Sequence, residues 1–328
     1  MSETWTACLP ESIRKQIALI PERLLSKMEE VRIREGKPIE IGFRDDYRFI
    51  NDSGDLGRLP KVGYLPTKMD CAFILEMLTE HSLYSYEEQL QKGYITLRGG
   101  HRVGIVGQTT VESGKVRHVK DVAGFNIRIA REVVGCSRPL LRGILDQDAH
   151  NIHNTLIISP PQQGKTTLLR DFSRQISDGD WPSYVNWPSR KVGIIDERSE
   201  LAACVQGVPS FQVGTRTDVL DGCPKAEGMM MMVRSMSPHV IVVDEIGREE
   251  DAIAIDEVAH AGIRILCSAH GYSIEDIRKR PMFRKLLESG IFQRYLVIGH
   301  TYAQGNIYRI YDAYGKELHN HILQRNIT

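Results

Sequence analysis

The chain has 328 residues, of which 41% are hydrophobic and 26% are charged. At about 150 residues per domain this length predicts roughly two domains, and the composition supports a folded core and excludes wholesale disorder. Lysine and arginine together number 42, as do aspartate and glutamate, so the formal net charge is zero. This balance argues against a strongly basic nucleic-acid-binding protein and against an acidic tail, although local basic patches can still exist.

Membrane and secretory signals are not evident in the sequence. No apolar run approaches the roughly 18–20 residues that a membrane-spanning helix needs, and Met1–Pro10 lacks a basic segment followed by an apolar one. The six cysteines are widely spaced and form no Cys-x-x-Cys pair, which argues against a disulfide framework or a zinc site. These features predict a cytoplasmic protein with reduced thiols.

Residues 1–135 are predicted to form the smaller, N-terminal α+β domain. Apolar residues at helical spacing predict helices over Leu9–Ile20, Thr67–Glu80 and Tyr84–Lys92. Val31–Arg34 and Ile39–Ile41 flank turn residues and predict a β-hairpin. Between Tyr94 and Arg131, glycines divide the apolar segments, which predicts several short strands.

Residues 136–328 alternate between strand and helix patterns. Aliphatic runs predict strands over Thr155–Ile158, Val192–Ile195, Val240–Val243 and Ile263–Cys267, with further strands within Tyr295–Ile322. Helical patterns predict helices over Lys165–Ile176 and Arg248–Ala261. This alternation is typical of a mainly parallel sheet with helices on both faces, so we predict an α/β domain here.

The segment between the strand at Leu156–Ile158 and the following helix matches a phosphate-binding loop. Backbone N–H groups of such a loop point at phosphates, and the helix dipole adds positive potential. Lys165 would reach the β- and γ-phosphates, Thr166 would place its hydroxyl on Mg²⁺, and Gly164 would let the backbone approach closely. The predicted nucleotide-binding residues are Ser159, Pro160, Pro161, Gln162, Gln163, Gly164, Lys165, Thr166 and Thr167.

Residue 159 departs from the pattern G-x-x-x-x-G-K-[ST], because serine stands where the pattern has glycine. We interpret Ser159 as a tolerated variant, since the turn needs a small residue there more than it needs a donor. Pro160 and Pro161 have no N–H, so the phosphate cradle has to be built from Gln162 onward. A plain strand-to-helix turn is the alternative for this segment.

Asp244 and Glu245 end the apolar strand Val240–Val243. In a nucleotide hydrolase the first acid holds the metal, usually through water, and the second polarises the attacking water. This pattern predicts Asp244, together with Thr166, as a Mg²⁺ ligand and Glu245 as a catalytic residue. The alternative is a buried strand whose polar end meets solvent.

Two other predicted strands also run into polar residues. His270 follows one of them, and the carboxyl end of such a strand is where ligands bind in parallel sheets. His270 is therefore a candidate sensor of the γ-phosphate, with a structural role as the alternative. Asp196–Glu200 follows another strand, and Glu197 is expected near the attacking water, with a solvated charged loop as an equally weighted alternative.

Several motifs occur in one order along the chain. They are Val31–Pro38, Gly99–Gly104, Phe125–Arg131, the phosphate loop, Asp196–Glu200, Gly214–Asp221 and Asp244–Gly247. In this set the chain resembles the stage III sporulation protein AA family of endospore-forming bacteria, which is in turn similar to the ATPases of type II and type IV secretion and pilus machines. The phosphate loop alone is generic, whereas the ordered set is specific and spans nearly the whole chain.

The resemblance implies a RecA-like P-loop ATPase domain behind a smaller N-terminal domain, in a hexameric motor that uses ATP and Mg²⁺. It implies that the motor docks on membrane channel proteins of a sporulation complex, at the cytosolic face, and couples hydrolysis to assembly or transport. The family's glutamate-containing box maps onto Asp196 and Glu197, its histidine box onto His270, and its second acidic strand onto Glu245. Asp244 departs from the secretion ATPases, which often have glycine there. Lys165, Glu197, Glu245 and His270 are thus the catalytic candidates.

Arginines of the N-terminal domain complete the site in those motors. The candidates in this chain are Arg98, Arg102, Arg128 and Arg131, and the sequence does not choose among them. An arginine that reaches the γ-phosphate would stabilise the charge of the transition state and make hydrolysis depend on domain closure.

Two other functions stay open from the sequence. A RecA-like nucleic-acid translocase has a similar motor core, but the zero net charge argues against nucleic acid as a partner. A nucleotide-dependent assembly scaffold with little hydrolysis is the other alternative, and Ser159 with the two adjacent prolines keeps it open.

Overall fold

A computed structural model describes residues 4–43, 46–60, 63–112, 115–301 and 305–322. The chain divides into two units, residues 1–131 and residues 132–328. The sequence placed this boundary at residue 135, four residues further along. Each unit has its own hydrophobic core.

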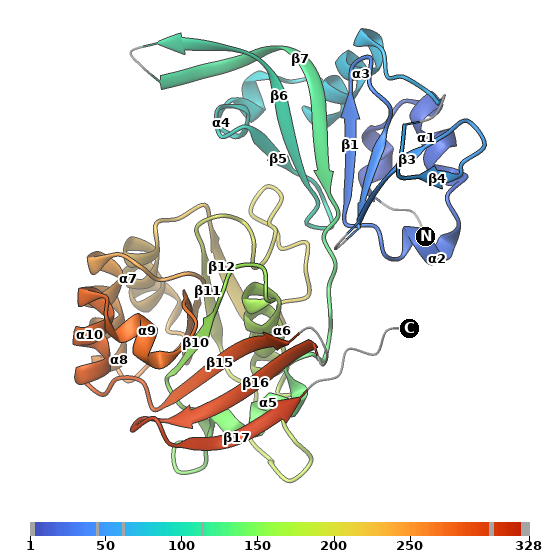
Figure 1. The fold of residues 1–328 in the computed structure, drawn as a ribbon. Helices are drawn as coiled ribbons and strands as arrows, with labels where there is room; N and C mark the ends of the chain where they lie inside the picture. Colours follow the sequence, from blue (N-terminus) through green and yellow to red (C-terminus); the bar gives the residue numbers. More distant parts are fainter. Residues whose placement is uncertain (1–3, 44–45, 61–62, 113–114, 302–304, 323–328) are drawn as a thin grey trace. The chain divides into compact units, whose positions relative to one another are not determined.

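The first unit is built around one antiparallel sheet (Figure 1). Its strands lie in the order β4-β3-β2-β1-β7-β6-β5. The strands are β1 (Glu30–Arg34), β2 (Glu40–Phe43), β3 (Asp46–Ile50), β4 (Leu56–Gly57), β5 (Tyr94–Thr96), β6 (Arg102–Glu112) and β7 (Lys115–Arg128). The helical segments are η1 (Thr4–Cys8), α1 (Glu11–Ala18), α2 (Glu22–Leu25), α3 (Lys68–Leu78), η2 (Tyr84–Tyr86) and α4 (Glu87–Gln91).

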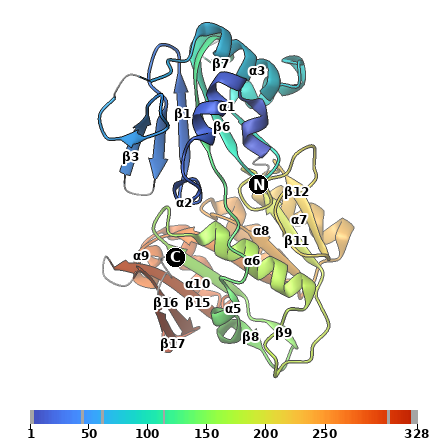
Figure 2. The same cartoon turned by 90° about the vertical axis from the view of Figure 1, so that its right-hand side faces the viewer.

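The helices and the hairpin predicted for this unit are confirmed. α3 begins after Thr67, whose hydroxyl accepts the N–H of Asp70 at 3.2 Å while the Asp70 carboxylate accepts the N–H of Thr67 at 2.7 Å. This reciprocal capping satisfies two donors at the start of the helix. β1 pairs antiparallel with β2, and Val31 and Ile33 are buried on the face against which α1 and α3 pack (Figure 2).

The prediction of several short strands after residue 93 is wrong. Residues 102–112 and 115–128 form two long strands, β6 and β7, that pair antiparallel. Gly107 lies at a shift in their register, and a β carbon there would lie 2.8 Å from the carbonyl oxygens of Lys120 and Asp121. The glycine therefore permits a bulge within a continuous ribbon, where the sequence pattern predicted a strand end.

The second unit contains an eight-stranded sheet in the order β12-β11-β13-β14-β10-β15-β16-β17. Its strands are β10 (Thr155–Ser159), β11 (Val192–Asp196), β12 (Thr217–Asp221), β13 (Val240–Val243), β14 (Arg264–His270), β15 (Arg294–Thr301), β16 (Gly305–Asp312) and β17 (Glu317–Ile322), with β8 (Leu145–Asp146) and β9 (Asn151–Ile152) as a separate pair. The helices are α5 (Arg138–Leu141), η3 (Arg142–Ile144), α6 (Lys165–Asp178), α7 (Lys225–Met236), α8 (Glu249–His260), α9 (Ile274–Arg278) and α10 (Pro281–Glu288).

The sheet is mainly parallel, as predicted. Neighbouring strands are parallel along the part of the sheet ordered β12-β11-β13-β14-β10-β15, and β16 and β17 extend the sheet in antiparallel fashion. α6 covers one face, whereas α7, α8, α9 and α10 cover the other (Figure 1). Alternate residues of each strand serve the two cores: Ile157 and Val242 belong to the core with α6, and Ile158 and Val243 to the opposite one.

This topology brings several strand ends to one edge of the sheet. β10 lies between β14 and β15, and its last residue, Ser159, is paired in register with His270. β13 lies between β11 and β14, so Asp196 and Asp244 follow at the same edge. In the part of the chain that the structure describes, no helix is long and apolar enough to span a membrane.

Candidate functional site

The predicted phosphate loop connects β10 to α6. Ser159 is the last residue of β10 and is fully buried, and its hydroxyl donates to the carbonyl of Pro160 at 2.8 Å. Gln162 and Gly164 both have positive φ, of 61° and 88°. Gly164 is the N-cap of α6, and glycine is favoured there because a residue with a β carbon rarely adopts this backbone conformation.

Contacts from neighbouring strands hold this loop. The N–H of Gly271 donates to the carbonyl of Ser159 at 3.2 Å, and the side-chain amide of Asn306 donates to the carbonyl of Gln163 at 3.1 Å. Asn306 lies on β16 and is only 5% exposed. The antiparallel extension of the sheet thus supports the loop, and the sequence analysis did not identify Asn306 because nothing in its local pattern points to the loop.

The start of α6 suits an anion. α6 spans 14 residues, and its N-terminal N–H groups donate to no capping side chain. Such groups, with the helix dipole, attract phosphate. Lys165 is 6% exposed, and burial lowers the pKa of its ammonium, an effect that Asp244 and Glu245 partly oppose. A buried cation beside open N–H donors fits the phosphates of a nucleotide.

Thr166 and Asp244 form the position that fits Mg²⁺. The hydroxyl of Thr166 lies 2.5 Å from Oδ2 of Asp244, so two hard oxygen donors stand together beside the helix N-terminus. Among the described residues there is no cluster of three or more His, Cys, Asp or Glu side chains able to hold a metal. Mg²⁺ characteristically binds through one or two protein groups, waters and substrate phosphates, so this sparse donor set fits it.

Glu245 adopts a left-handed backbone conformation with φ of 54°. Its Oε1 lies 3.4 Å from Nε2 of His270, and its Oε2 lies 3.1 Å from Nη1 of Arg198. Nδ1 of His270 in turn lies 2.9 Å from Nζ of Lys165. The structure therefore joins Lys165, His270 and Glu245 in one chain of contacts.

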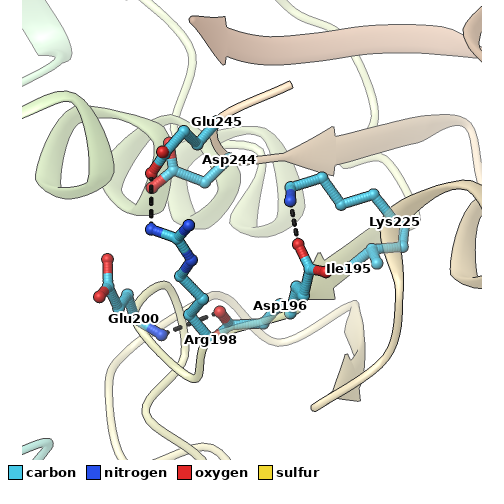
Figure 3. Close-up of a pocket in the computed structure, with 8 residues that line it drawn as sticks. Ile195, Asp196, Arg198, Glu200, Lys225, Asp244 and Glu245 are labelled. Carbon is cyan, nitrogen blue, oxygen red and sulfur yellow. Dashed lines mark hydrogen bonds and ion pairs between the residues drawn. The ribbon is translucent and has the colours of Figure 1, made fainter. Parts of the chain in front are cut away.

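A pocket opens beyond the ends of β11 and β13 (Figure 3). Arg198 points across it toward Glu245, whereas Lys225, the first residue of α7, forms an ion pair with Glu197. Burial alone would raise the pKa of Glu197, but the hydrogen bond to Lys225 and the positive charges of Lys225, Arg248 and Arg198 together outweigh it, and the pKa is lowered. The residues that line the pocket are Ile195, Asp196, Glu197, Arg198, Glu200, Lys225, Asp244 and Glu245.

Asp196 holds the loop that carries Arg198. Its carboxylate is 3% exposed and accepts the N–H groups of Glu200, Leu201 and Ala202 at 2.9, 3.0 and 2.8 Å. Burial raises the pKa of Asp196, and the three N–H groups partly counteract this rise. The Asp196 carboxylate thus stabilises the backbone of the loop that follows β11.

A second, smaller pocket lies beside the first turns of α6. Arg170, on α6, stacks over the ring of Phe211 at 3.9 Å and donates to the carbonyls of Leu201 and Glu200. The lining residues are Glu132, Val133, Val134, Thr167, Arg170, Asp171, Arg174 and Gln212.

The four arginine candidates all lie in the first unit. Arg131 donates to the carbonyl of Met28 at 2.7 Å, and Arg102 lies over the ring of Tyr94 at 3.5 Å. Arg128 is the last residue of β7, opposite Arg102, and Arg98 lies in an exposed turn after β5. Arg102 and Arg131 are therefore engaged within their own unit.

The structure brings together Lys165, Thr166, Asp244, Glu245 and His270, all of which the sequence analysis selected. It adds Arg198 and Lys225, and also Ser268, whose hydroxyl donates to Asp244 and accepts the N–H of Glu245. The sequence analysis selected none of these three residues. Arg198 stands inside the charged segment Asp196–Glu200, but its partner is remote in the sequence. Ser268 is a single hydroxyl within an aliphatic strand and gave no signal.

Comparisons with known proteins agree with this architecture. The family model described as sporulation stage III, protein AA, matches residues 3–318. The stage III sporulation protein AA of Bacillus subtilis (strain 168) is 47% identical over 310 residues, which cover 94% of this chain and 95% of that protein.

Solved structures with a similar fold include those of DotB and PilT. The ATPase DotB of Legionella pneumophila has a TM-score of 0.59 at 12% identity, over 93% of this chain and 81% of DotB. The pilus retraction motor PilT, solved with bound ADP, has a TM-score of 0.58 at 14% identity, over 90% of this chain and 80% of PilT. The predicted fold is confirmed: a RecA-like core follows a smaller α+β domain along the chain. The chain belongs to the stage III sporulation protein AA family.

Proposed function

We propose that the chain is an ATPase that converts ATP and water to ADP and phosphate. The observation that carries this proposal is the meeting of Lys165 and Thr166, at the start of α6, with Asp244 and Glu245 at the end of β13. A phosphate-binding helix terminus, a metal position and a carboxylate for water are the three parts that nucleoside triphosphate hydrolysis needs.

Each residue then has a separate task. Lys165 and the N–H groups of α6 bind the β- and γ-phosphates, and Thr166 and Asp244 hold Mg²⁺, which supplies positive charge to the phosphate oxygens. Glu245 orients the attacking water and accepts its proton. His270, between Lys165 and Glu245, connects phosphate binding to the position of that carboxylate.

In the cell we propose that the chain acts as a ring-forming motor. The RecA-like fold and the family support this proposal. Arg98, Arg102, Arg128 and Arg131 are the candidates to complete the site, and membrane channel proteins of the sporulation complex are the proposed docking partners. ATP hydrolysis would then be coupled to assembly or transport.

Phosphate release at saturating MgATP, measured over a series of protein concentrations, tests the proposal. We expect a rate that rises more than linearly with protein concentration and that falls at least about 100-fold in Glu245→Gln. Glu249→Gln is the matched control, because Glu249 is exposed on α8 and pairs only weakly with Lys285 at the surface.

The outcomes separate the alternatives. Equal phosphate release in the wild type and in Glu245→Gln would contradict the ATPase. ATP binding without phosphate release, but with ATP-dependent ring formation, would favour an assembly scaffold. Salt-sensitive binding of single-stranded DNA, with ATP hydrolysis stimulated by the DNA, would favour a nucleic-acid translocase.

A further inference from the structure

Ser268 is a buried serine that contacts both acids of the site. It lies on β14, between Cys267 and Ala269, and is fully buried. Its hydroxyl donates to Oδ1 of Asp244 and accepts the N–H of Glu245 at 3.0 Å. Its carbonyl accepts the N–H of Ile246 at 2.8 Å.

The Ser268 hydroxyl uses its only hydrogen and one of its lone pairs in these bonds. A serine hydroxyl has one hydrogen to donate and lone pairs to accept with, and here the hydrogen goes to Asp244 while a lone pair takes the N–H of Glu245. Thr166 binds the other carboxylate oxygen of Asp244. Both oxygens of Asp244 are thereby fixed, one by α6 and one by β14.

The backbone at Glu245 needs such support. Its φ of 54° is uncommon for a residue with a β carbon, and such conformations persist only where the surroundings enforce them. The hydroxyl and the carbonyl of Ser268 take the N–H groups of Glu245 and of the next residue, Ile246. The turn that directs Glu245 toward His270 is therefore held from β14.

We propose that Ser268 is a positioning residue for the hydrolysis proposed above, on which this inference rests. It acts through Asp244 and Glu245 and touches no substrate. It keeps the Asp244 carboxylate aligned with Thr166 and keeps Glu245 in the conformation that presents its carboxylate to His270. A purely structural serine would stabilise the fold without affecting the Mg²⁺ dependence or the rate of phosphate release.

The test compares Ser268→Ala and Ser268→Thr with Ser173→Ala. Ser173 is the matched control, because it is also fully buried in the second unit but donates only to the carbonyl of Leu169 within α6. Phosphate release is measured against Mg²⁺ concentration, binding of a fluorescent ATP analogue is measured in EDTA, and the folded fraction is measured by thermal unfolding.

In Ser268→Ala we expect kcat to fall about 10- to 100-fold, because small displacements of catalytic groups have effects of this size. The Mg²⁺ concentration for half-maximal activity should rise, whereas nucleotide binding in EDTA should stay within about 2-fold, since Lys165 and α6 provide it. Ser268→Thr keeps the hydroxyl and should restore most of kcat. Ser173→Ala should leave kcat and the Mg²⁺ dependence unchanged.

A double variant adds an independent criterion. In a Glu245→Gln background, Ser268→Ala should cause little further loss of kcat, because residues that act as a unit are not additive. Full additivity would overturn the inference, as would a folded Ser268→Ala protein with wild-type kcat and Mg²⁺ dependence, or a folded Ser268→Thr protein as inactive as Ser268→Ala. A wild-type chain without MgATP turnover would instead contradict the proposed function, and the inference would fall with it.

Discussion

Nζ of Lys165 lies 2.9 Å from Nδ1 of His270, although the two residues are 105 positions apart in the sequence. An ammonium group can only donate, so Nδ1 accepts and the ring carries its proton on Nε2. That nitrogen faces Oε1 of Glu245 at 3.4 Å. The histidine thus connects the lysine that we propose binds phosphate to the carboxylate that we propose positions the attacking water.

This connection predicts the effect of His270→Ala. We expect kcat to fall roughly 10- to 100-fold, because Glu245 loses one of its two side-chain partners, while the affinity for ATP stays within about 2-fold. Steady-state phosphate release and binding of a fluorescent ATP analogue measure the two effects. His260→Ala is the control, because His260 is exposed at the end of α8. An unchanged kcat in His270→Ala would contradict this role of His270.

Lys165→Ala should weaken nucleotide binding. The loss of a charge-assisted bond to phosphate costs about 3 kcal/mol, which corresponds to an affinity roughly 100-fold lower. Titration with a fluorescent ATP analogue measures this change. The exposed Lys285→Ala, which removes the same charge from α10, should bind ATP as the wild type does. Equal affinity in Lys165→Ala would place the phosphates elsewhere.

Substitution of Arg198 tests whether its ion pair with Glu245 raises or lowers kcat. The Arg198 side chain is 58% exposed, and exposed pairs contribute about 0–1 kcal/mol, so we expect kcat to fall about 3- to 5-fold in Arg198→Ala, with unchanged ATP affinity. Arg198→Lys should lie between the two. Arg234→Ala, on the exposed side of α7, is the charge-matched control. A rise in kcat would mean that Arg198 restrains Glu245.

Asp171 predicts a pH dependence of stability. Burial alone would raise the pKa of this α6 carboxylate, but N–H groups of Ser137 and Gly135, the Ser137 hydroxyl and Arg174 outweigh it, so the pKa is lowered. A lowered pKa in the folded state adds stability that is present above the unfolded pKa of about 3.9 and is lost as the pH falls through the folded value.

Asp171→Asn should therefore unfold more easily at pH 7, by about 1–3 kcal/mol, because buried N–H groups lose a charged acceptor. The difference between wild type and variant should shrink as the pH falls from 5 to 3. Thermal unfolding over this range measures it, with Asp256→Asn, at a half-exposed aspartate of α8, as the control. A difference that does not depend on pH would contradict the assignment to the charge of Asp171.

Local patterns were sufficient to predict the strands and helices that carry the site. The aliphatic runs before Ser159 and Asp244 are short-range signals, and the structure confirms both strands. β12 was not anticipated, because its only aliphatic residues are the adjacent Val219 and Leu220, which stand between two acids, and its strand character comes from parallel pairing with β11. Pairing between distant segments is not encoded in a local pattern.

The same limit applies within the site. Lys165, Asp244 and Glu245 were predicted because each ends or begins an element of recognisable type. Ser268 and Arg198 owe their roles to partners on other strands, more than 20 and more than 40 positions away. The long β6–β7 ribbon was missed for a related reason, since the meaning of Gly107 depends on the strand opposite it.

The place of β10 in the sheet also has a consequence for synthesis of the chain. β10 pairs with β14 and β15, and β14, the earlier of the two, begins 105 positions after Ser159. At about 5–20 residues per second, the ribosome needs roughly 5–21 s to reach that point. The first unit, whose strands all precede residue 129, can fold in that interval, whereas the aliphatic β10 waits for both of its neighbouring strands and is exposed to chaperones and proteases. A chain arrested before residue 264 therefore contains the whole phosphate-loop motif without either of the strands that pair with β10.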